Sequence, residues 1–459
     1  MKIKKTLAAV ASMAMLATTA FTVPMNAGAA GGGNYSSTIR GDLSTKFDKY
    51  LVMHTSAHVP DAAFTYTIEP GDGVTGTETT YEVFAGVGTP VFRADDTANT
   101  GSADAGKVVF SNADTTIAEA SVAAGDAPAF TTTGEGNTAD EKYAKKVLTI
   151  DFPNDTPFKE PGIYRYVITE NPGTSVPGVT MDPVSTRTLD VYVVDDYDSA
   201  TNTNYLKFDT AVLYSGTITS GPKKELPTGK TKTDVPNGLE AGDKSAGFTN
   251  SYTARTLSFG KEVEGNQGSK DKYFKFTLTI ANAAGATLDV TVADMETSTT
   301  ETSATIYTKA VMDAANNADD VDTIDGHQIK VGTTGTVTKY YYLRDGQYVT
   351  ISGLPQGATY TLTEAAEDYT SAEHTATIAV PAVGTEGDPG YVAAKTYNDD
   401  VSGTIGAKDI YTGFTNTKIG LLPTGILLSV AGPAVIGIIA LLGIAVLFIR
   451  GRRRRAEEE

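Results

Sequence analysis

The sequence contains no cysteine, no tryptophan and only four histidines among its 459 residues. Without cysteine, the chain cannot form disulfides, use a thiolate nucleophile or bind zinc through sulfur. The one histidine pair with i, i+4 spacing, His54 and His58, falls in a strand-like stretch rather than on a helix. We therefore expect no metal site, no cofactor and no thiol chemistry.

Positive charge is also scarce. The chain has 37 Lys and Arg against 55 Asp and Glu, which gives a formal net charge of −18. This balance argues against nucleic acid and against anionic membrane surfaces as partners, because both attract cationic proteins.

Long helical periodicity is missing between the two ends of the chain. In its place, apolar and polar residues alternate with period two, as over residues 64–68 and 274–280, and Gly and Pro punctuate the chain between such stretches. This pattern predicts an all-β protein with a sandwich-like, immunoglobulin-like architecture.

The first 30 residues read as a secretory signal peptide. Three lysines open the chain, residues 7–21 are apolar and uncharged, and small residues at 27–29 form a cleavage site. A membrane anchor is the weaker reading of residues 1–30, because the apolar stretch is short and ends in a cleavage motif. We therefore expect export.

The last 41 residues, 419–459, combine three signals in a fixed order. The motif Leu422-Pro423-Thr424-Gly425 precedes an apolar run over 426–449, which is long enough for a transmembrane helix, and five arginines follow within 450–455. The arginines are expected to stay cytoplasmic. The sequence predicts a stop-transfer segment held in the membrane by a basic tail; an ordinary single-pass protein with a chance motif is the alternative.

Three further motifs each occur twice, in the same order. They are Phe-x-Lys-x-aliphatic at 47–51 and 259–263, Tyr-x-aliphatic-x-Glu at 166–170 and 360–364, and Gly-Phe-Thr-Asn at 247–250 and 413–416. The repetition predicts two versions of one β-sandwich domain, over residues 31–253 and 254–418.

Each repeat places one lysine, one glutamate and one asparagine on its apolar face, because residues i and i+2 of a strand share a face. The two sets are Lys49, Glu170 and Asn250, and Lys261, Glu364 and Asn416. One interpretation is a buried Lys–Glu ion pair beside an asparagine, since buried charges must pair or neutralise. The recurrence of all three residues favours a chemical interpretation.

That interpretation is an autocatalytic crosslink. Burial lowers the pKa of a lysine and raises that of a carboxylic acid, and a neutral amine is a nucleophile. A protonated glutamate is expected to polarise the asparagine carbonyl, so that attack by the lysine expels ammonia and leaves a Lys–Asn isopeptide bond. The catalytic acids, Glu170 and Glu364, would shuttle protons without being consumed. Such a single-turnover reaction does not make the chain an enzyme.

These motifs resemble the isopeptide-linked major pilins of Gram-positive bacteria, the streptococcal backbone type with Cna B-like domains. The tripartite end resembles the sorting signal of sortase substrates. The resemblance implies bonds between Lys49 and Asn250 and between Lys261 and Asn416, with cleavage after Thr424. It also implies a cell-surface pilus anchored to peptidoglycan.

The same resemblance implies the partners. They are a pilin-class sortase, a housekeeping sortase, neighbouring pilin subunits, peptidoglycan and host surface ligands. A pilin sortase would join Thr424 to an exposed lysine of the next subunit. We expect this acceptor to be Lys244, in a polar loop before Asn250, with Lys230 and Lys232 as alternatives. An adhesin or stalk protein anchored to the wall without polymerising remains the alternative function.

Overall fold

The structure is a computed structural model of the whole chain. It describes residues 39–93, 106–118, 141–152, 158–171, 176–224, 243–294, 300–301, 328–373, 378–380, 395–397 and 399–420. The predicted signal peptide, the motif at 422–425, the apolar run 426–449 and the alternative acceptors Lys230 and Lys232 lie outside these residues. Within the described ranges, no helix is both long and apolar enough to cross a membrane.

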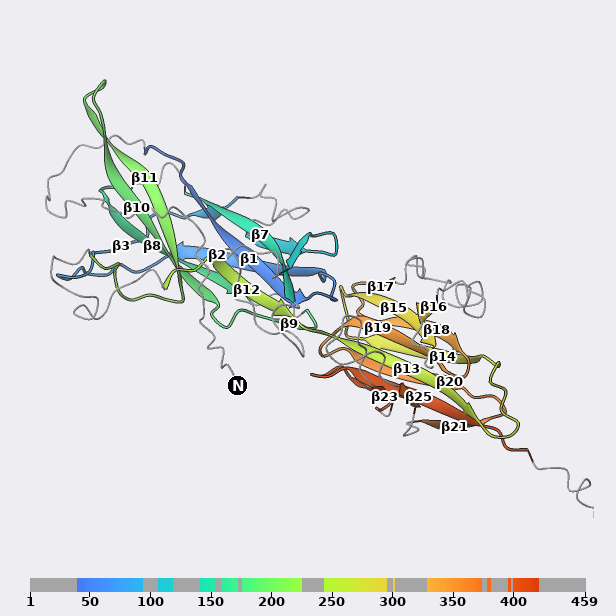
Figure 1. The fold of residues 1–459 in the computed structure, drawn as a ribbon. Helices are drawn as coiled ribbons and strands as arrows, with labels where there is room; N and C mark the ends of the chain where they lie inside the picture. The colour runs from blue at the N-terminus through green and yellow to red at the C-terminus, as the bar shows by residue number, and fades with distance from the viewer. Residues whose placement is uncertain are drawn as a thin grey trace, which may run out of the picture.

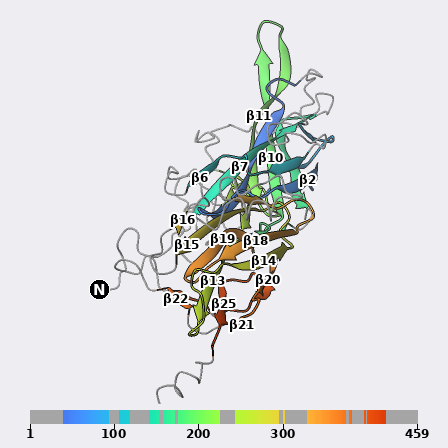
Figure 2. The same ribbon diagram turned by 90° about the vertical axis from the view of Figure 1, so that its right-hand side faces the viewer.

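The regular elements of the described chain are all strands, which confirms the predicted all-β class (Figure 1). They form two β-sandwiches in tandem, which we call the N-terminal sandwich (residues 39–252) and the C-terminal sandwich (residues 254–420). The two lie end to end in both views (Figures 1 and 2).

The N-terminal sandwich consists of two sheets. The first has the order β4 (Val91–Phe92), β7 (Glu141–Asp151), β1 (Ser44–His54), β12 (Gly247–Tyr252) and β9 (Val179–Thr180), with β6 (Thr116–Ala118) also on β7. The second has the order β11 (Thr203–Ser215), β10 (Thr186–Asp198), β8 (Gly162–Asn171), β2 (Ala62–Pro70) and β5 (Lys107–Phe110), with β3 (Phe84–Ala85) also on β8.

The C-terminal sandwich repeats this plan. One sheet has the order β16 (Thr300–Glu301), β15 (Thr287–Asp294), β19 (Gln347–Pro355), β13 (Ala254–Glu264), β25 (Ile410–Thr417) and β21 (Thr370–Glu373), with β17 (Gln328–Lys330) on β15. The facing sheet has the order β18 (Val337–Leu343), β14 (Phe274–Ala281), β20 (Thr359–Ala365) and β24 (Ser402–Thr404). A separate pair consists of β22 (Ile378–Val380) and β23 (Lys395–Tyr397).

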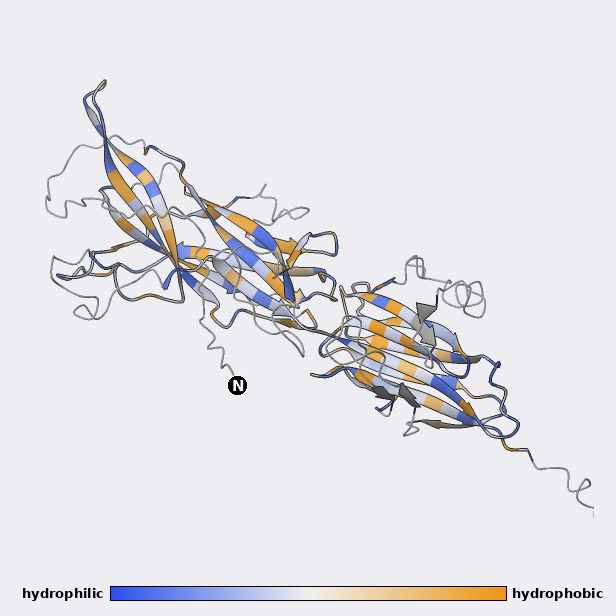
Figure 3. Ribbon diagram, viewed as in Figure 1, coloured by the Kyte–Doolittle hydropathy of each residue, from blue (hydrophilic) through white to orange (hydrophobic). Residues whose placement is uncertain are grey.

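Each sandwich has its own hydrophobic core, and the alternation read from the sequence explains it. Apolar and polar residues alternate along the strands (Figure 3). The apolar members of β14, for example, are buried while the residues between them are partly exposed. Two main clusters of buried apolar side chains result, one formed by residues from 39 to 252 and one by residues from 257 to 414.

In each sandwich the first long strand pairs in parallel with the last one. β1 lies beside β12 in the N-terminal sandwich, and β13 lies beside β25 in the C-terminal sandwich. Parallel neighbours need a long crossover connection, and here the crossover is nearly the whole sandwich. Residues far apart in sequence are thereby brought side by side.

The junction between the sandwiches is short. β12 ends at Tyr252 and β13 begins at Ala254, so a single residue, Thr253, connects them. Across the junction, the amide of Asp61 donates to the carbonyl of Gly285 at 2.9 Å.

Candidate crosslinking sites

The lysine and asparagine of each predicted trio occupy the same register positions in both sandwiches. On β1 and β12, Lys49 lies opposite Phe248 and Leu51 opposite Asn250. On β13 and β25, Lys261 lies opposite Phe414 and Val263 opposite Asn416. Because side chains two residues apart share a face, lysine and asparagine emerge next to each other from neighbouring strands.

The glutamate of each trio comes from the facing sheet. Glu170 lies on β8 opposite Tyr66 of β2, and Glu364 lies on β20 opposite Phe276 of β14. Each site is therefore closed only when the two sheets of its sandwich pack together.

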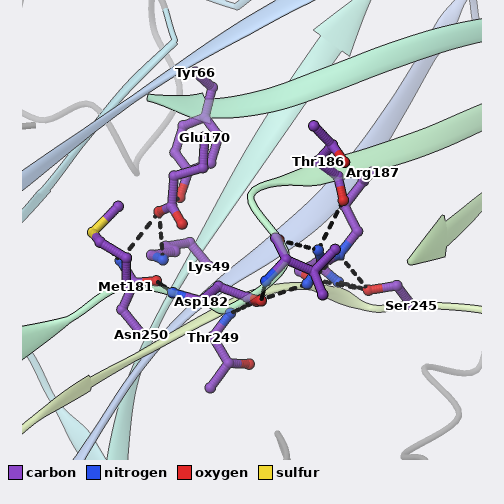
Figure 4. A network of polar contacts seen from close by, with 12 residues as sticks. Lys49, Tyr66, Glu170, Met181, Asp182, Thr186, Arg187, Ser245, Thr249 and Asn250 are labelled. Atoms are coloured by element: carbon purple, nitrogen blue, oxygen red, sulfur yellow. Dashed lines mark hydrogen bonds and ion pairs between the residues drawn. The ribbon is translucent and has the colours of Figure 1, made fainter. Parts of the chain in front are cut away.

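In the N-terminal sandwich the three side chains meet on one carboxylate oxygen (Figure 4). Lys49 Nζ lies 2.6 Å from Glu170 Oε1, and Asn250 Nδ2 donates to the same oxygen at 3.2 Å. Tyr66 donates its hydroxyl to this oxygen at 2.7 Å. Lys49 and Asn250 are fully buried, and Glu170 is 1% exposed.

The carboxamide of Asn250 has a fixed orientation that differs from the expected one. The backbone N–H of Asp182 approaches Asn250 Oδ1 at 2.8 Å, and a backbone N–H can only donate. The oxygen therefore faces Asp182 and the nitrogen faces Glu170. We expected the glutamate to polarise the asparagine carbonyl, but in this geometry Glu170 contacts the leaving nitrogen.

In the C-terminal sandwich the lysine and glutamate also form a buried ion pair. Lys261 Nζ lies 2.7 Å from Glu364 Oε1, and both side chains are fully buried. Ser371 donates its hydroxyl to Glu364 Oε2 at 2.9 Å. The carboxamide oxygen and nitrogen of Asn416 are buried and have no hydrogen-bond partner among the described residues.

Burial makes both lysines better nucleophiles. Desolvation lowers the pKa of Lys49 from 10.5 to about 8, although the charge of Glu170 opposes the shift. Desolvation lowers the pKa of Lys261 likewise, to about 8, against the charge of Glu364. At pH 7 about a tenth of each amine is then neutral, whereas an exposed lysine is almost wholly charged.

An aromatic ring supports each ammonium group. Lys49 Nζ lies 4.7 Å from the centroid of Phe64, and Lys261 Nζ lies 4.5 Å from that of Phe274. These phenylalanines begin the alternating stripes on β2 and β14. The cation–π contact holds the lysine over the site while the surrounding rings exclude water.

Sequence patterns did not reveal two further parts of the N-terminal site. One is Tyr66, which the stripe over 64–68 contained but did not mark as a partner of Glu170. The other is the segment around Asp182 and Arg187, which are joined at 2.7 Å and nearly buried. This segment carries no repeated motif, so only its position against β12 reveals it.

The predicted acceptor Lys244 is exposed, immediately before β12. It forms an isolated bridge with Tyr214, and the amide of the next residue, Ser245, donates to Leu213 at 2.8 Å. An exposed side chain on an anchored backbone is what an enzyme joining two subunits would require.

Comparisons with known proteins agree with the motifs. A protein named Pilin from Streptococcus pyogenes serotype M1 is 27% identical over 307 residues, which cover 66% of this chain and 72% of the relative. This relative confirms the resemblance to streptococcal pilins. A family model described as a domain of unknown function (DUF7601) matches residues 255–418.

Solved structures of pilins are also similar to this chain. The crystal structure of the major pilin from Streptococcus pyogenes is 20% identical, with a TM-score of 0.44, and the match covers 83% of this chain and 100% of that one. The major pilin T3.2 from Streptococcus pyogenes serotype GAS13637 is 16% identical with a TM-score of 0.41, over 83% of this chain and 99% of that one.

Proposed function

We propose that the chain is a structural backbone subunit of a Gram-positive pilus, stiffened by one Lys–Asn isopeptide bond in each of two domains, 31–253 and 254–418. The observation that carries the proposal is the repeated site. Lysine, glutamate and asparagine are buried together at identical register positions in both sandwiches. The sequence relative named Pilin supports the assignment to a pilus.

The crosslinking reaction uses only groups of this chain. The neutral amine of Lys49 or Lys261 attacks the side-chain carbonyl carbon of Asn250 or Asn416, respectively. The C–N bond to the carboxamide nitrogen breaks, and this nitrogen leaves as ammonia. In the N-terminal site Glu170 is hydrogen-bonded to that nitrogen. Glu170 donates a proton to the departing nitrogen and takes up one proton from the lysine nitrogen. Burial of all three groups in one core keeps them close together and excludes water.

The bonds would stabilise each domain in two ways. Joining the first strand to the last closes a loop of nearly the whole domain, and by analogy with a disulfide the chain-entropy gain is about 5 kcal/mol for each bond. In addition, no reductant would break these crosslinks, which suits a chain without cysteine.

Polymerisation would use the two ends of the subunit. A pilin-class sortase would cleave after Thr424 and transfer the threonine carbonyl to Lys244 of the next subunit, and a housekeeping sortase would attach the last subunit to peptidoglycan. Head-to-tail linkage of this kind does not close on itself, so it produces a fibre. Host surface ligands would bind to the surface of the assembled pilus.

The test of polymerisation is a ladder of covalent multimers in cell-wall extracts boiled in detergent. Wild-type cells should show the ladder, and deletion of residues 422–425 should abolish it together with wall attachment. Lys244→Ala should abolish the ladder without unfolding the protein, because the side chain is exposed. Lys207→Ala is a matched control, since Lys207 is also an exposed lysine of the N-terminal sandwich.

The outcomes separate the functions. If the ladder persists in Lys244→Ala, the acceptor is another lysine, and Lys230 and Lys232 are the next residues to replace. If wild-type cells anchor the protein but form no ladder, the pilus proposal fails and a non-polymerising adhesin or stalk is the better account.

A further inference from the structure

We propose that the backbone N–H of Asp182 is the oxyanion donor of the crosslinking reaction in the N-terminal sandwich, and that the carboxylate of Asp182 positions this donor. The inference deepens the proposed crosslink between Lys49 and Asn250 and rests on it. It assigns carbonyl activation to the backbone of one segment rather than to the glutamate.

The geometry separates the two ends of the Asn250 carboxamide. Its oxygen accepts from the amide of Asp182 at 2.8 Å, and its nitrogen donates to Glu170 at 3.2 Å and to the sulfur of Met181 at 3.4 Å. Figure 4 shows these contacts on opposite sides of the carboxamide. When Lys49 adds to the carbonyl carbon, negative charge develops on this oxygen, where a donor is already in place.

The side chain of Asp182 fixes its own backbone against the reacting strand. Its Oδ2 accepts from the amide of Thr249 at 2.8 Å and from Arg187 at 2.7 Å, while Oδ1 accepts from the amide of Val184 at 2.9 Å. Arg187 in turn donates to the carbonyl of Gly247 at 2.8 Å. Because Thr249 and Gly247 belong to β12, the segment is attached to the strand that carries Asn250.

The reaction balances without any further group. Addition of the neutral Lys49 amine forms the C–N bond and turns the carbonyl into an oxyanion held by the Asp182 N–H. Collapse of this intermediate restores the carbonyl and breaks the bond to the old carboxamide nitrogen. Glu170 protonates that nitrogen, which leaves as ammonia, and takes up a proton from the lysine nitrogen.

The C-terminal sandwich provides a natural contrast. Continuing the register of β9 and β12 by two residues brings Asp182 beside Thr249. In the C-terminal sandwich, the residue beside Thr415 is Ala372, which has no carboxylate. In the described part of that sandwich the carboxamide of Asn416 has no donor at its oxygen. The site there serves as an internal control within the same molecule.

The experiment measures the rate of each crosslink in the full chain. The chain is synthesised and folded by cell-free translation at pH 6, where the lysines are mostly charged, and is then shifted to pH 8. Samples are quenched in denaturant and digested, and mass spectrometry follows the joined peptides containing Lys49–Asn250 and Lys261–Asn416. Two changes are compared with wild type: replacement of the Asp182 amide N–H by an ester oxygen, and Asp182→Ala.

Loss of one oxyanion donor typically slows a reaction by about 10²–10³-fold. We expect the ester at Asp182 to slow the N-terminal crosslink at least about tenfold and to leave the C-terminal crosslink unchanged. Asp182→Ala should also slow only the N-terminal crosslink, because it releases the segment from β12. An ester at Ser185 is the matched control and should stay within about threefold of wild type, since the Asp182 N–H and the contacts of the Asp182 carboxylate all remain.

An N-terminal crosslink that keeps its wild-type rate in either Asp182 variant would overturn the inference. Folding is checked by protease resistance in a Glu170→Ala background, where the N-terminal crosslink cannot form. If the chain with the ester at Asp182 does not fold, the rate of the N-terminal crosslink in Asp182→Ala is the test. If wild-type chains form neither crosslink, the proposed function fails instead, so the two failures are distinguishable.

Discussion

At the scale of single residues, each of the two sites places a lysine–glutamate ion pair in a hydrophobic core, where a charge is destabilising. An unpaired ammonium or carboxylate in a core would cost several kcal/mol, and a buried ion pair recovers this only in part. Lys49 and Lys261 are fully buried, and desolvation lowers the pKa of each to about 8. Formation of an amide removes the ammonium altogether. Burial therefore both activates the lysine and favours the crosslinked product.

The first prediction is a pH dependence of crosslinking. In the folded chain the pKa of each lysine is about 8, below the ordinary value of 10.5. The fraction of each lysine that is a neutral amine therefore increases as the pH rises toward 8. The rate should therefore increase about tenfold per unit below pH 8 and level off above it. Chains folded at pH 6 and shifted to a series of higher pH values, with ammonia loss followed by mass, provide the measurement. A rate that is the same at pH 6 and pH 8 would show that deprotonation of the lysine does not limit the reaction.

The sequence predicted the residues of each trio but not their full surroundings. Lys49, Glu170 and Asn250 could be found because each lies on a strand with period two, and because each motif is repeated. Asp182 and Arg187 could not, since their contacts with β12 depend on how a segment without periodicity packs. For the same reason, the sequence led us to expect Glu170 at the carbonyl oxygen of Asn250. In the structure that oxygen accepts from the amide of Asp182, and Glu170 contacts the carboxamide nitrogen.

At the scale of the strands, the pairing of the first strand with the last is the feature on which each site depends. Gly247 begins β12 with φ of +156°, and a Cβ at this position would lie 1.7 Å from the carbonyl oxygen of Asp48. Only glycine allows β12 to approach β1 so closely. The glycine of the Gly-Phe-Thr-Asn motif thereby permits the close pairing of β12 with β1 that brings Asn250 beside Lys49.

The second prediction concerns this glycine. Gly247→Ala should destabilise the N-terminal sandwich by about 1–3 kcal/mol, through backbone strain and overlap, and should slow its crosslink. Thermal unfolding in the Glu170→Ala background measures stability without the covalent bond. Gly332→Ala is the control, because nothing lies within 4 Å of a Cβ at that position. Equal unfolding temperatures for the two variants would contradict the close approach of β12 and β1.

Strand prediction succeeded where an element is long enough to show a period. The alternation over 64–68 and 274–280 anticipated β2 and β14, which span Ala62–Pro70 and Phe274–Ala281. Strands of two residues, such as β3 and β9, contain too few positions for alternation to be recognised. Their pairing is decided by the long strands beside them.

At the scale of the whole molecule, the position of the acceptor lysine and the crosslink of the C-terminal sandwich would define the route of mechanical tension. With Lys244 as acceptor, tension would enter just before β12, pass through Thr253 into β13, and reach Lys261. There the isopeptide bond would carry it to Asn416 on β25 and out toward the C-terminus. Residues 262–415 would bear no load, and the crosslink of the N-terminal sandwich would lie beside the route rather than on it.

The third prediction follows from this route. A single molecule held at residue 244 and after residue 418 should resist extension in the wild type. Glu364→Ala should release residues 262–415 and lengthen the molecule by roughly 500 Å. Glu170→Ala is the matched control and should add little length, because tension passes only along β12 of that sandwich. Equal lengthening in the two variants would contradict the proposed route.

The measurement that tests the central claim most directly is the intact mass of the mature ectodomain. Two crosslinks require the loss of two ammonia molecules relative to the sequence. Glu170→Ala should restore one of these losses and Glu364→Ala the other, because each glutamate serves one site. A wild-type mass equal to that of the sequence would contradict the account, and the two buried trios would then be ion pairs with a neighbouring asparagine.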